Sequence, residues 1–491
     1  MNKVSMLCLV LTESSIDGNI KFYQKYSDYC DILELRADFL APEEWPKIHS
    51  LPSQIRKPII LTFRKPADGG HFKEGEALRI QLMRKALEGA FQYIDLEEDF
   101  SDNDFEAHVR KKGVTIIRSF HDFTGIPHEL AQRIRKLPRN AKEIPKAAVM
   151  ANTTEDLLSL FEAAEELGSG DRIILAMGSF GFPSRVLAVK LGSMLTYSSD
   201  SKQQAAPGQL DPESLAKIYN FKSITSETEI YGIIGNPVMH SLSPKIHNRG
   251  FRMLNLPKIY VPFQVDNLEH FFKLARVLNI RGFSVTIPHK ENVRKYLHQS
   301  DEGVEKIGAC NTVVLSPANQ WTGYNTDAMG FLLPLKKQFQ GTLKNRRATV
   351  IGAGGGAKAV CFALKKEGME ILVVNRTKAR ADELAREWQM QSAGLDEIER
   401  IKDYSDVIVQ TTSMGMAPLE KMNPLEAYHY SGHEMAYDIV YKPPLTLFLE
   451  QAQKAGCSIL NGESMLKEQA YLQFKAFTGQ EYPDPLGLTL F

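Results

Sequence analysis

The stretch Ile144-Pro-Lys-Ala-Ala-Val-Met-Ala151 is almost continuously apolar, and a helical pattern over 154–167 and a second apolar run over 172–177 follow it. Apolar runs without strict alternation are typical of strands buried on both faces, as in a parallel sheet. Thr153, with Asp156 three residues later, predicts where the intervening helix begins. The stretch therefore predicts a strand–helix–strand unit with parallel strands.

The same alternation continues in both directions, up to about residue 209. Eight short runs rich in Val, Ile, Leu and aromatic residues are expected to form strands: Val4–Leu11, Asp31–Ala37, Pro58–Phe63, Tyr93–Glu97, Thr115–Phe120, Ile144–Ala151, Arg172–Met177 and Met194–Ser199. Eight strands alternating with helices is the number in a (β/α)8 or TIM-type barrel, for which ~210 residues is near the lower size limit. The first prediction is an α/β barrel over residues 1–212.

Charged side chains stand where these strands end, and a barrel carries its active site at that end. They are Glu34, Arg36, Arg64, Glu97, His121 and Arg185, while Lys146 lies inside its strand. Burying an ammonium is costly unless it is paired or deprotonated. Desolvation and neighbouring arginines would both favour a neutral amine at Lys146, which is the form that attacks a carbonyl to give a Schiff base.

The surrounding residues fit this chemistry. His121 could move a proton at neutral pH, with Glu97 orienting its ring. The arginines would bind an anionic substrate, most naturally a carboxylate, through paired hydrogen bonds. From the residues alone, a structural cluster of salt bridges at the barrel mouth is an equally open interpretation.

Six short segments in this half resemble type I 3-dehydroquinate dehydratases, in the order of that family. They are Glu34-Leu-Arg-Ala-Asp38, Leu61-Thr-Phe-Arg64, Tyr93-Ile-Asp-Leu-Glu97, Ser119-Phe-His-Asp-Phe123, Ile144-Pro-Lys146 and Ala206-Pro-Gly-Gln209. The resemblance implies that Lys146 forms an imine with the substrate ketone and that His121, partnered by Glu97, removes the neighbouring proton and helps expel water. It also implies five substrate-binding residues: Glu34, Arg36, Arg64, Arg185 and Gln209. Ala205 stands where many members of the family have serine.

Residues 213–229 are expected to be a linker, and a new domain is expected to begin with Ile230. Further on, Arg347-Ala-Thr-Val-Ile351 predicts a strand, followed at once by Gly352-Ala-Gly-Gly-Gly-Ala357 and a helix to about residue 367. A Gly-x-Gly-x-x-Ala motif between a strand and a helix is the context of a dinucleotide site, with the pyrophosphate on the helix N-terminus. A Gly-rich turn before a basic helix is the alternative.

The next predicted strand, 370–374, ends in Asn375-Arg376-Thr377, with Arg380 close behind. An NAD site usually carries an acidic residue at this place to bind the ribose hydroxyls. Arginine there favours a 2′-phosphate instead, and therefore NADPH over NADH.

Residues 230–335 predict a further α/β domain that is dense in polar motifs. These are His240-Ser-Leu-Ser-Pro244, Ser284-Val-Thr-Ile-Pro-His-Lys290, Gly308-Ala-Cys-Asn-Thr312 and Gly323-Tyr-Asn-Thr-Asp327. The serines and Asn311 could equally be turn or cap residues. Lys290 and Asp327 are stronger candidates, because a lysine and a carboxylate facing one hydroxyl can relay the proton that accompanies a hydride transfer.

These motifs, with Tyr437-Asp-Ile-Val-Tyr441 and Asn461-Gly-Glu-Ser-Met-Leu-Lys-Glu-Gln469, resemble shikimate dehydrogenases from about residue 231 to 474. The resemblance implies Lys290 and Asp327 as the catalytic pair. Substrate contacts are implied for Ser241, Ser243, Ser284, Thr286, Asn311, Thr326, Tyr441 and Gln469. Contacts to NADPH are implied for Gly352, Gly354, Gly355, Ala357, Asn375, Arg376, Thr377, Arg380, Thr412 and Ser413. Ser284 and Gln410 stand where asparagine is common in relatives.

The resulting domain prediction is a barrel (1–212), a linker (213–229), a substrate-binding α/β domain (230–335, completed by C-terminal helices over 462–491) and a Rossmann NADP-binding domain (336–461). This order resembles the fused bifunctional dehydratase–dehydrogenases best known from plants. Two alternatives remain: a quinate or shikimate dehydrogenase that prefers NAD, and a non-enzymatic quinate-responsive regulator.

The composition agrees with small-molecule chemistry. The 491 residues include 59 Lys+Arg and 59 Asp+Glu, for a formal charge of zero, which argues against a nucleic-acid or membrane-surface partner. Five scattered cysteines without a Cys-x-x-Cys pair give no disulfide framework and no metal-ligand set. We see no signal peptide, transit peptide or membrane-spanning run, and therefore expect a cytoplasmic protein.

Overall fold

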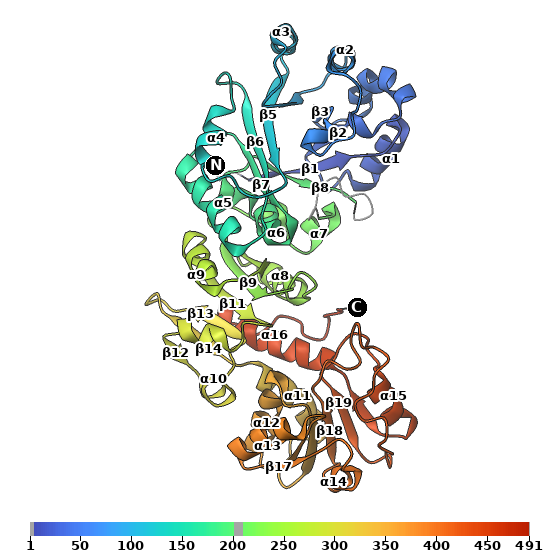
Figure 1. Ribbon diagram of the computed structural model, residues 1–491, viewed down its shortest axis with the longest axis vertical. Helices are drawn as coiled ribbons and strands as arrows, with labels where there is room; N and C mark the ends of the chain where they lie inside the picture. Colours follow the sequence, from blue (N-terminus) through green and yellow to red (C-terminus); the bar gives the residue numbers. More distant parts are fainter. Residues whose placement is uncertain (1–3, 201–209, 491) are drawn as a thin grey trace. The chain divides into compact units, whose positions relative to one another are not determined.

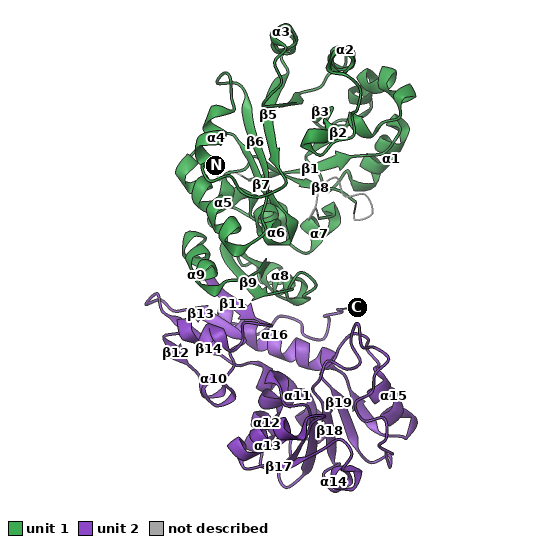
Figure 2. Cartoon of the chain, in the orientation of Figure 1, with its two compact units in different colours: residues 1–280 green, residues 281–491 purple. Residues whose placement is uncertain are grey.

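The computed structural model describes residues 4–200 and 210–490, and the chain divides into two compact units, residues 1–280 and 281–491 (Figure 2). The division falls inside the predicted domain 230–335, so the compact units and the predicted domains divide the chain differently. The predicted domain boundaries therefore stay predictions.

Eight parallel strands form the centre of the first unit (Figure 1). They are β1 (Met6–Leu11), β2 (Ile32–Arg36), β3 (Ile59–Thr62), β4 (Tyr93–Glu97), β5 (Thr115–Asp122), β6 (Ile144–Met150), β7 (Ile173–Met177) and β8 (Leu195–Ser198). The sheet order is β7-β6-β5-β4-β3-β2-β1-β8, and the two end strands, β7 and β8, contact each other. All eight predicted strands and the barrel architecture are confirmed.

The connections of the barrel are mostly helical. The helices are α1 (Ile16–Tyr26), α2 (Glu76–Ala86), α3 (Asn103–Lys111), α4 (Leu130–Lys136), α5 (Thr154–Leu167), α6 (Gly178–Val186) and α7 (Pro212–Lys217). Helix α5 begins as predicted, with a capping box between Thr153 and Asp156. Between β2 and β3 the chain instead forms a 3₁₀ segment, Pro42–Gln54, because Pro46 and Pro52 remove the amide hydrogens that an α-helix needs.

Side chains alternate between the inside and the outside of the barrel, since successive residues of a strand point to opposite faces. Leu9, Leu33, Leu61 and Leu96 belong to the core between the strands and the helices. Their neighbours of opposite parity fill the inside of the barrel, where Cys8, Val10, Ile32, Ile60, Ile117, Ile173 and Leu195 form one cluster. Glu34, Asp95, His121, Lys146 and Tyr197 are each an even number of residues from an inward apolar residue of their own strand or its rim. Their side chains therefore point into the barrel.

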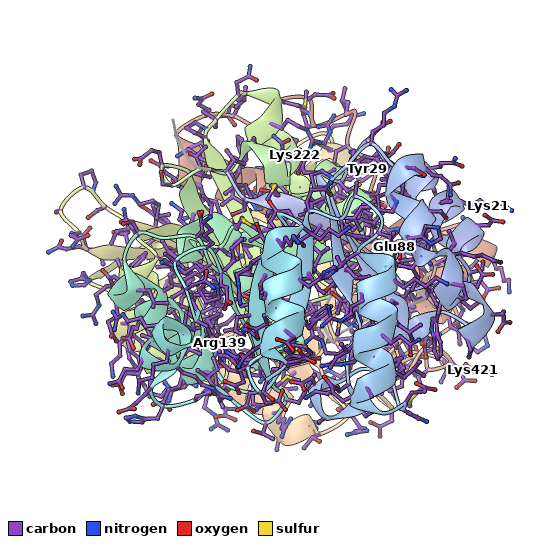
Figure 3. All side chains as sticks on the ribbon, turned by 90° about the horizontal axis from the view of Figure 1, so that it is seen from above. Lys21, Tyr29, Glu88, Arg139, Lys222 and Lys421 are labelled. Carbon is purple, nitrogen blue, oxygen red and sulfur yellow. The ribbon has the colours of Figure 1, made fainter. Side chains whose placement is uncertain are left out.

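The first unit continues beyond the barrel. A parallel pair, β9 (Glu229–Gly235) and β10 (Lys258–Gln264), is connected through α8 (Ser243–Met253) and followed by α9 (Leu268–Val277). Helix α9 packs on α5, and the Asp266 carboxylate accepts hydrogen bonds from the Thr154 amide (3.0 Å) and hydroxyl (2.5 Å). Exposed side chains such as Lys21 on α1 and Glu88 project from this unit (Figure 3).

The second unit contains strands of a mixed sheet and a six-stranded parallel sheet. The first part comprises β11 (Ile280–Val285), β12 (Gln299–Ser300), α10 (Glu302–Ile307), β13 (Thr312–Leu315), β14 (Trp321–Tyr324) and α11 (Asp327–Gln338). The parallel part comprises β15 (Arg347–Ile351), α12 (Gly355–Lys366), β16 (Glu370–Val374), α13 (Lys378–Trp388), β17 (Gln391–Ala393), α14 (Ile398–Asp403), β18 (Val407–Gln410), β19 (Met435–Asp438), α15 (Leu447–Lys454), β20 (Ser458–Leu460) and α16 (Gly462–Thr478).

The parallel sheet has the strand order β17-β16-β15-β18-β19-β20. This is the order 3-2-1-4-5-6 of a Rossmann fold, whose ligand crevice lies where the order reverses, between β15 and β18. The predicted Rossmann fold is therefore confirmed. One detail differs from the prediction, because the segment 462–490 contains a single helix, α16, rather than several. Within residues 4–200 and 210–490, no helix is both long and apolar enough to cross a bilayer.

Candidate active sites

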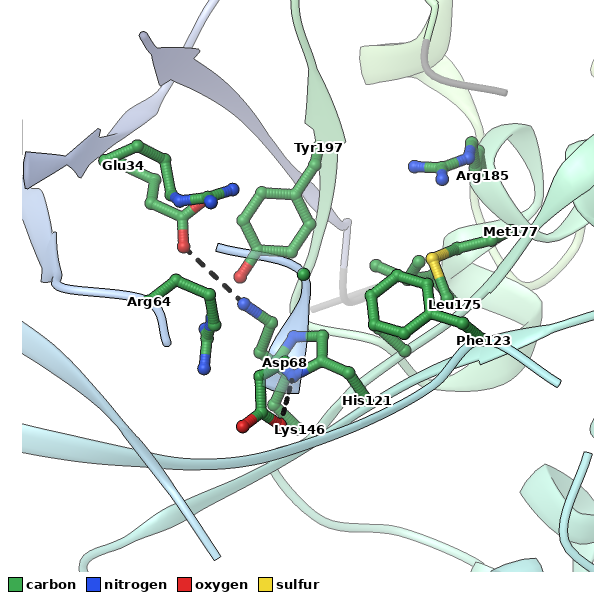
Figure 4. Close-up of a pocket in the computed structure, with 13 residues that line it drawn as sticks. Glu34, Arg64, Asp68, His121, Phe123, Lys146, Leu175, Met177, Arg185 and Tyr197 are labelled. Atoms are coloured by element: carbon green, nitrogen blue, oxygen red, sulfur yellow. Dashed lines mark ion pairs between the residues drawn. The ribbon is translucent and has the colours of Figure 1, made fainter. Parts of the chain in front are cut away.

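The inward residues at the strand ends of the barrel enclose a pocket (Figure 4). The lining residues include Glu34, Arg36, Arg64, Asp68, His121, Lys146, Arg185 and Tyr197, with Phe123, Leu175 and Met177 as apolar wall. The structure therefore brings six predicted site residues together in one pocket: Glu34, Arg36, Arg64, His121, Lys146 and Arg185. Gln209 lies outside the described residues, as does Ala205.

Lys146 is the centre of this pocket, and its side chain is only 5 % exposed. Its ammonium nitrogen Nζ lies 2.8 Å from Asp95 Oδ2 and 3.6 Å from Glu34 Oε1. The ring of Tyr197 covers the amine at 4.5 Å from its centroid. The immediate charged partners of the lysine are therefore carboxylates rather than the arginines that we expected from the sequence.

Asp95 links the lysine to an arginine and is a site residue that the sequence analysis missed. Its other oxygen, Oδ1, lies 2.8 Å from Arg64 and accepts a 2.5 Å hydrogen bond from the Ser119 hydroxyl. Burial by itself raises the pKa of Asp95, but the charges of Arg64 and Lys146 outweigh it and hold the pKa well below its ordinary value. The inward parity that Asp95 shares with Glu97 was the available signal.

His121 lies beside the lysine as a neutral base. Burial lowers the pKa of His121 well below 6.5, and the positive charges of Arg64 and Lys146 lower it further. Its Nδ1 atom lies 3.5 Å from Asp68 Oδ1, and no direct hydrogen bond to this nitrogen is present among the described residues. A neutral imidazole can accept a proton, so the pocket holds an amine and a base close together.

The prediction that Glu97 orients His121 stays a prediction, because the ion pairs of Glu97 are with arginines. Glu97 forms buried ion pairs with Arg64 (3.2 Å) and with Arg79 (2.9 Å), and Asp68 is the carboxylate beside the histidine. Asp68 comes from the loop after β3, so alternation along a strand could not reveal it. Gly70 in the same loop lets the chain turn back, since a Cβ there would lie 2.0 Å from the Arg64 carbonyl oxygen.

The two remaining arginines of the pocket, Arg36 and Arg185, have different surroundings. Arg36 forms a bidentate ion pair with the buried Asp38, at 2.9 and 2.8 Å. Arg185 is 1 % exposed, and burial lowers its pKa to about 10, which still leaves the guanidinium charged at neutral pH. Two fixed positive charges near a buried amine suit an anionic substrate.

A second polar cluster lies in the second unit. Lys290 Nζ is 2.5 Å from Asp327 Oδ2, and the Asn311 amide donates to Asp327 (2.8 Å) and to Thr326 (2.9 Å). The Gln469 side chain accepts a long hydrogen bond, 3.4 Å, from the same amide. The lysine and carboxylate that we predicted as a catalytic pair are therefore in direct contact.

The other predicted substrate-binding residues are distributed over both compact units. Ser284 donates to the Gln473 side chain at 2.8 Å, and Thr286 follows β11. Tyr441 follows β19, and burial raises the pKa of its phenol. Ser241 and Ser243 belong to the first unit, where Ser243 begins α8 and its amide donates to the Ser241 hydroxyl at 3.2 Å.

The Gly-rich turn has the geometry of a pyrophosphate site. Helix α12 begins at Gly355 with Gly354 as its N-cap, and no side chain caps its amide groups. A Cβ atom at Gly354 or Gly355 would meet open space, so the backbone there is accessible. Gly352 adopts a φ of 120° and would place a Cβ 2.5 Å from the Thr411 hydroxyl, which explains why glycine is needed. Ala357 is buried within α12.

Residues after β16 and β18 belong to the same predicted NADPH site. Arg376 and Arg380 are exposed after β16, and Asn375 donates to the Thr377 carbonyl at 3.0 Å. Thr412 and Ser413 follow β18, the strand next to β15 in the sheet. Gln410 organises that loop, since its amide donates to the carbonyls of Thr412 (3.2 Å) and Met414 (2.8 Å). This accounts for a longer amide at the position where asparagine is common.

Comparison with known proteins matches three family models to successive segments of the chain. The family model of type I 3-dehydroquinase matches residues 7–226, that of the shikimate dehydrogenase substrate binding domain matches 233–313, and that of shikimate/quinate 5-dehydrogenase matches 334–439.

Three relatives illustrate the likeness. The bifunctional 3-dehydroquinate dehydratase/shikimate dehydrogenase of Arabidopsis thaliana, a chloroplastic protein, is 31% identical over 98% of this chain and 83% of its own length. A shikimate dehydrogenase (NADP(+)) of Caldanaerobacter subterraneus is 42% identical over 52% of this chain and 94% of its own length. A crystal structure of shikimate dehydrogenase in complex with NADP+ superimposes with a TM-score of 0.50, at 35% identity, over 53% of this chain and 93% of that one. The chain therefore belongs to the family of bifunctional 3-dehydroquinate dehydratase/shikimate dehydrogenases.

Proposed function

We propose that the barrel dehydrates 3-dehydroquinate to 3-dehydroshikimate through an imine on Lys146, and that the second unit reduces this product to shikimate with NADPH. The observation that carries the first half is the buried amine of Lys146 next to His121, whose pKa lies well below 6.5, in an arginine-lined pocket. A structural salt-bridge cluster would not need a neutral base beside the lysine.

The dehydration uses four groups of the pocket. Arg185 and Arg36 bind the substrate carboxylate and hydroxyls. His121 takes one proton from the Lys146 ammonium, and the amine formed in this way adds to the ketone carbon. The ketone oxygen leaves as water with that proton and a second one from the nitrogen, which leaves a protonated imine. His121 then takes a proton from the adjacent carbon, and the electron pair left behind expels the β-hydroxyl. That hydroxyl leaves as a second water with the proton from His121. Hydrolysis of the imine consumes one water and restores the amine, so the net change is the loss of one water.

We assign the orienting role to Asp68 rather than Glu97. Asp68 is the carboxylate beside His121 Nδ1, and its distance of 3.5 Å can shorten when substrate excludes water from the pocket. Glu97 keeps Arg64 and Arg79 in place and so contributes to the shape of the pocket.

Borohydride trapping tests the barrel. Wild-type protein incubated with 3-dehydroquinate and borohydride, then digested for peptide mass analysis, should carry one adduct on Lys146. Lys146→Ala should carry none, whereas Lys142→Ala, which removes an exposed lysine of the same segment, should still be labelled at Lys146. An adduct at another lysine, or no adduct in the wild type, would refute the imine mechanism.

The reduction would use the Lys290–Asp327 pair. NADPH supplies the hydride when it is bound. The Lys290 ammonium donates the proton to the oxygen of the reacting ketone, and Asp327 holds that ammonium at 2.5 Å. Asn311 fixes the carboxylate through its 2.8 Å hydrogen bond, so the pair has a defined direction.

The residues around the Gly-rich turn fit NADPH. The open backbone at Gly354 and Gly355 and the uncapped start of α12 suit a pyrophosphate, and the exposed Arg376 and Arg380 suit a 2′-phosphate. The ratio of kcat/KM for NADP+ over NAD+, measured with shikimate and with quinate, tests this choice. A preference for NAD+ with quinate would favour the quinate dehydrogenase alternative, and the absence of both activities would favour a non-enzymatic regulator.

A further inference from the structure

Tyr197 is a pocket residue to which the mechanism above gives no role. It lies on β8 at an inward position, is 4 % exposed, and covers the Lys146 amine with the face of its ring. Figure 4 shows its hydroxyl pointing into the pocket, toward the space around the Lys146 amine. The residue is therefore placed at the reacting atom and not in the surrounding apolar wall.

The hydroxyl of Tyr197 is buried and has no hydrogen-bond partner within the described part of the chain. Burying a hydroxyl without a partner is destabilising, so such groups are rare unless a ligand satisfies them. Its polar neighbours are paired: Glu34 accepts from the Thr62 hydroxyl at 2.9 Å, and Asp95 accepts from Lys146. Because no described residue satisfies this hydroxyl, it is available to a group that enters with the substrate.

We propose that the Tyr197 hydroxyl donates a hydrogen bond to the oxygen on the substrate carbon that Lys146 attacks. This inference rests on the imine mechanism proposed above. The oxygen of the substrate and the nitrogen of Lys146 are bonded to the same carbon during the attack, so they lie close together. The Tyr197 hydroxyl is at the edge of the ring that covers this nitrogen, and a hydrogen bond to the oxygen spans about 2.8 Å. Tyr197 is then a catalytic residue in the sense that it touches the reacting atoms.

Tyr197 donates a hydrogen bond in this step but transfers no proton. As the C–N bond forms, the electron pair of the C=O bond moves onto the oxygen, and a donor aimed at that oxygen stabilises the developing charge. The phenol keeps its own proton. Burial raises the pKa of Tyr197 well above 10, and the nearby Glu34 charge raises it further, so the group is a neutral donor throughout.

Tyr197→Phe is the decisive variant, because it removes the hydroxyl and keeps the ring over the amine. We expect a decrease of about 10- to 100-fold in dehydratase kcat/KM, mostly in kcat, and slower formation of the borohydride-trapped adduct. The melting temperature of the free protein should be unchanged or higher, since a buried unpaired hydroxyl is lost. Shikimate dehydrogenase activity, measured on the same protein, should not change.

Tyr430→Phe is the matched control. Its hydroxyl is also buried without a partner among the described residues, but it lies in the second unit, against Tyr428 and Phe448. It should leave dehydratase activity unchanged.

The adduct and the kinetics together distinguish the role of Tyr197 from the imine mechanism on Lys146. If wild-type protein gives the Lys146 adduct and Tyr197→Phe retains dehydratase kcat/KM within twofold, the role of Tyr197 is overturned while the imine mechanism stands. A lower melting temperature with unchanged kcat/KM would show a merely structural hydroxyl. If the wild type gives no adduct on Lys146, both proposals fail together.

Discussion

Asp95→Asn should destabilise the barrel by removing the one carboxylate that neutralises two buried cations. Asp95 lies 2.8 Å from both Lys146 and Arg64, and all three side chains are at most 5 % exposed. Breaking a buried ion pair costs about 3–5 kcal/mol, because a charge is left without compensation. Lys146 keeps Glu34 at 3.6 Å and Arg64 keeps Glu97 at 3.2 Å, so the low end, about 3 kcal/mol, applies.

Differential scanning calorimetry measures this change. For a domain of this size, 1 kcal/mol corresponds to about 2–4 °C, so the transition of the barrel should move down by about 6–12 °C at pH 7. The control is Glu213→Gln, which breaks the exposed Lys217–Glu213 pair on α7 and should not move the transition.

The pH dependence gives a second check with a defined sign. The folded-state pKa of Asp95 lies below its unfolded value, so its stabilisation is fully present above the unfolded value of about 3.9 and is lost as the pH falls through the folded pKa. The difference in transition temperature between wild type and Asp95→Asn should therefore stay constant from about pH 5 to 8 and become smaller below about pH 4. An unchanged transition in Asp95→Asn at pH 7 would refute the reasoning.

Four further outcomes are expected. Asp68→Asn should lower dehydratase kcat by about 10- to 100-fold without a large change in melting temperature, measured by steady-state kinetics and calorimetry; an unaltered kcat would remove Asp68 from the mechanism. Because the pKa of His121 is lowered, this base is neutral at pH 7 and becomes protonated only at lower pH. The loss of dehydratase kcat/KM on the acidic side of its pH profile should therefore occur below pH 6.5. A loss that already begins above pH 7 would contradict this. Lys290→Ala should abolish shikimate formation and leave dehydration intact, and loss of both activities in a folded variant would show that the two sites depend on each other. Arg376→Ala should reduce the NADP+ over NAD+ ratio of kcat/KM by about 10- to 100-fold, and an unchanged ratio would place the 2′-phosphate elsewhere.

The architecture could be predicted from the sequence, because hydrophobic periodicity and the Gly-rich turn are local signals. The eight apolar runs predict the eight strands of the barrel, and the residues from Arg347 to Ala357 predict a strand, a turn and a helix, all of which the structure contains. The sequence also singled out Lys146 inside an apolar strand, His121 at the end of a strand, and Lys290 and Asp327 in polar motifs. Such ionisable residues can be recognised from residue type and local pattern, without any tertiary information.

Which groups of the site contact one another could not be predicted from the sequence. Asp68 approaches His121 from a loop whose course depends on Gly70 packing against the Arg64 backbone, and no strand pattern encodes that approach. Asp95 and Tyr197 reach Lys146 from strands that are not its neighbours in the sheet, across the inside of the barrel. The physical reason is that periodicity fixes the face on which a side chain lies, whereas the curvature and register of the closed sheet fix its partner.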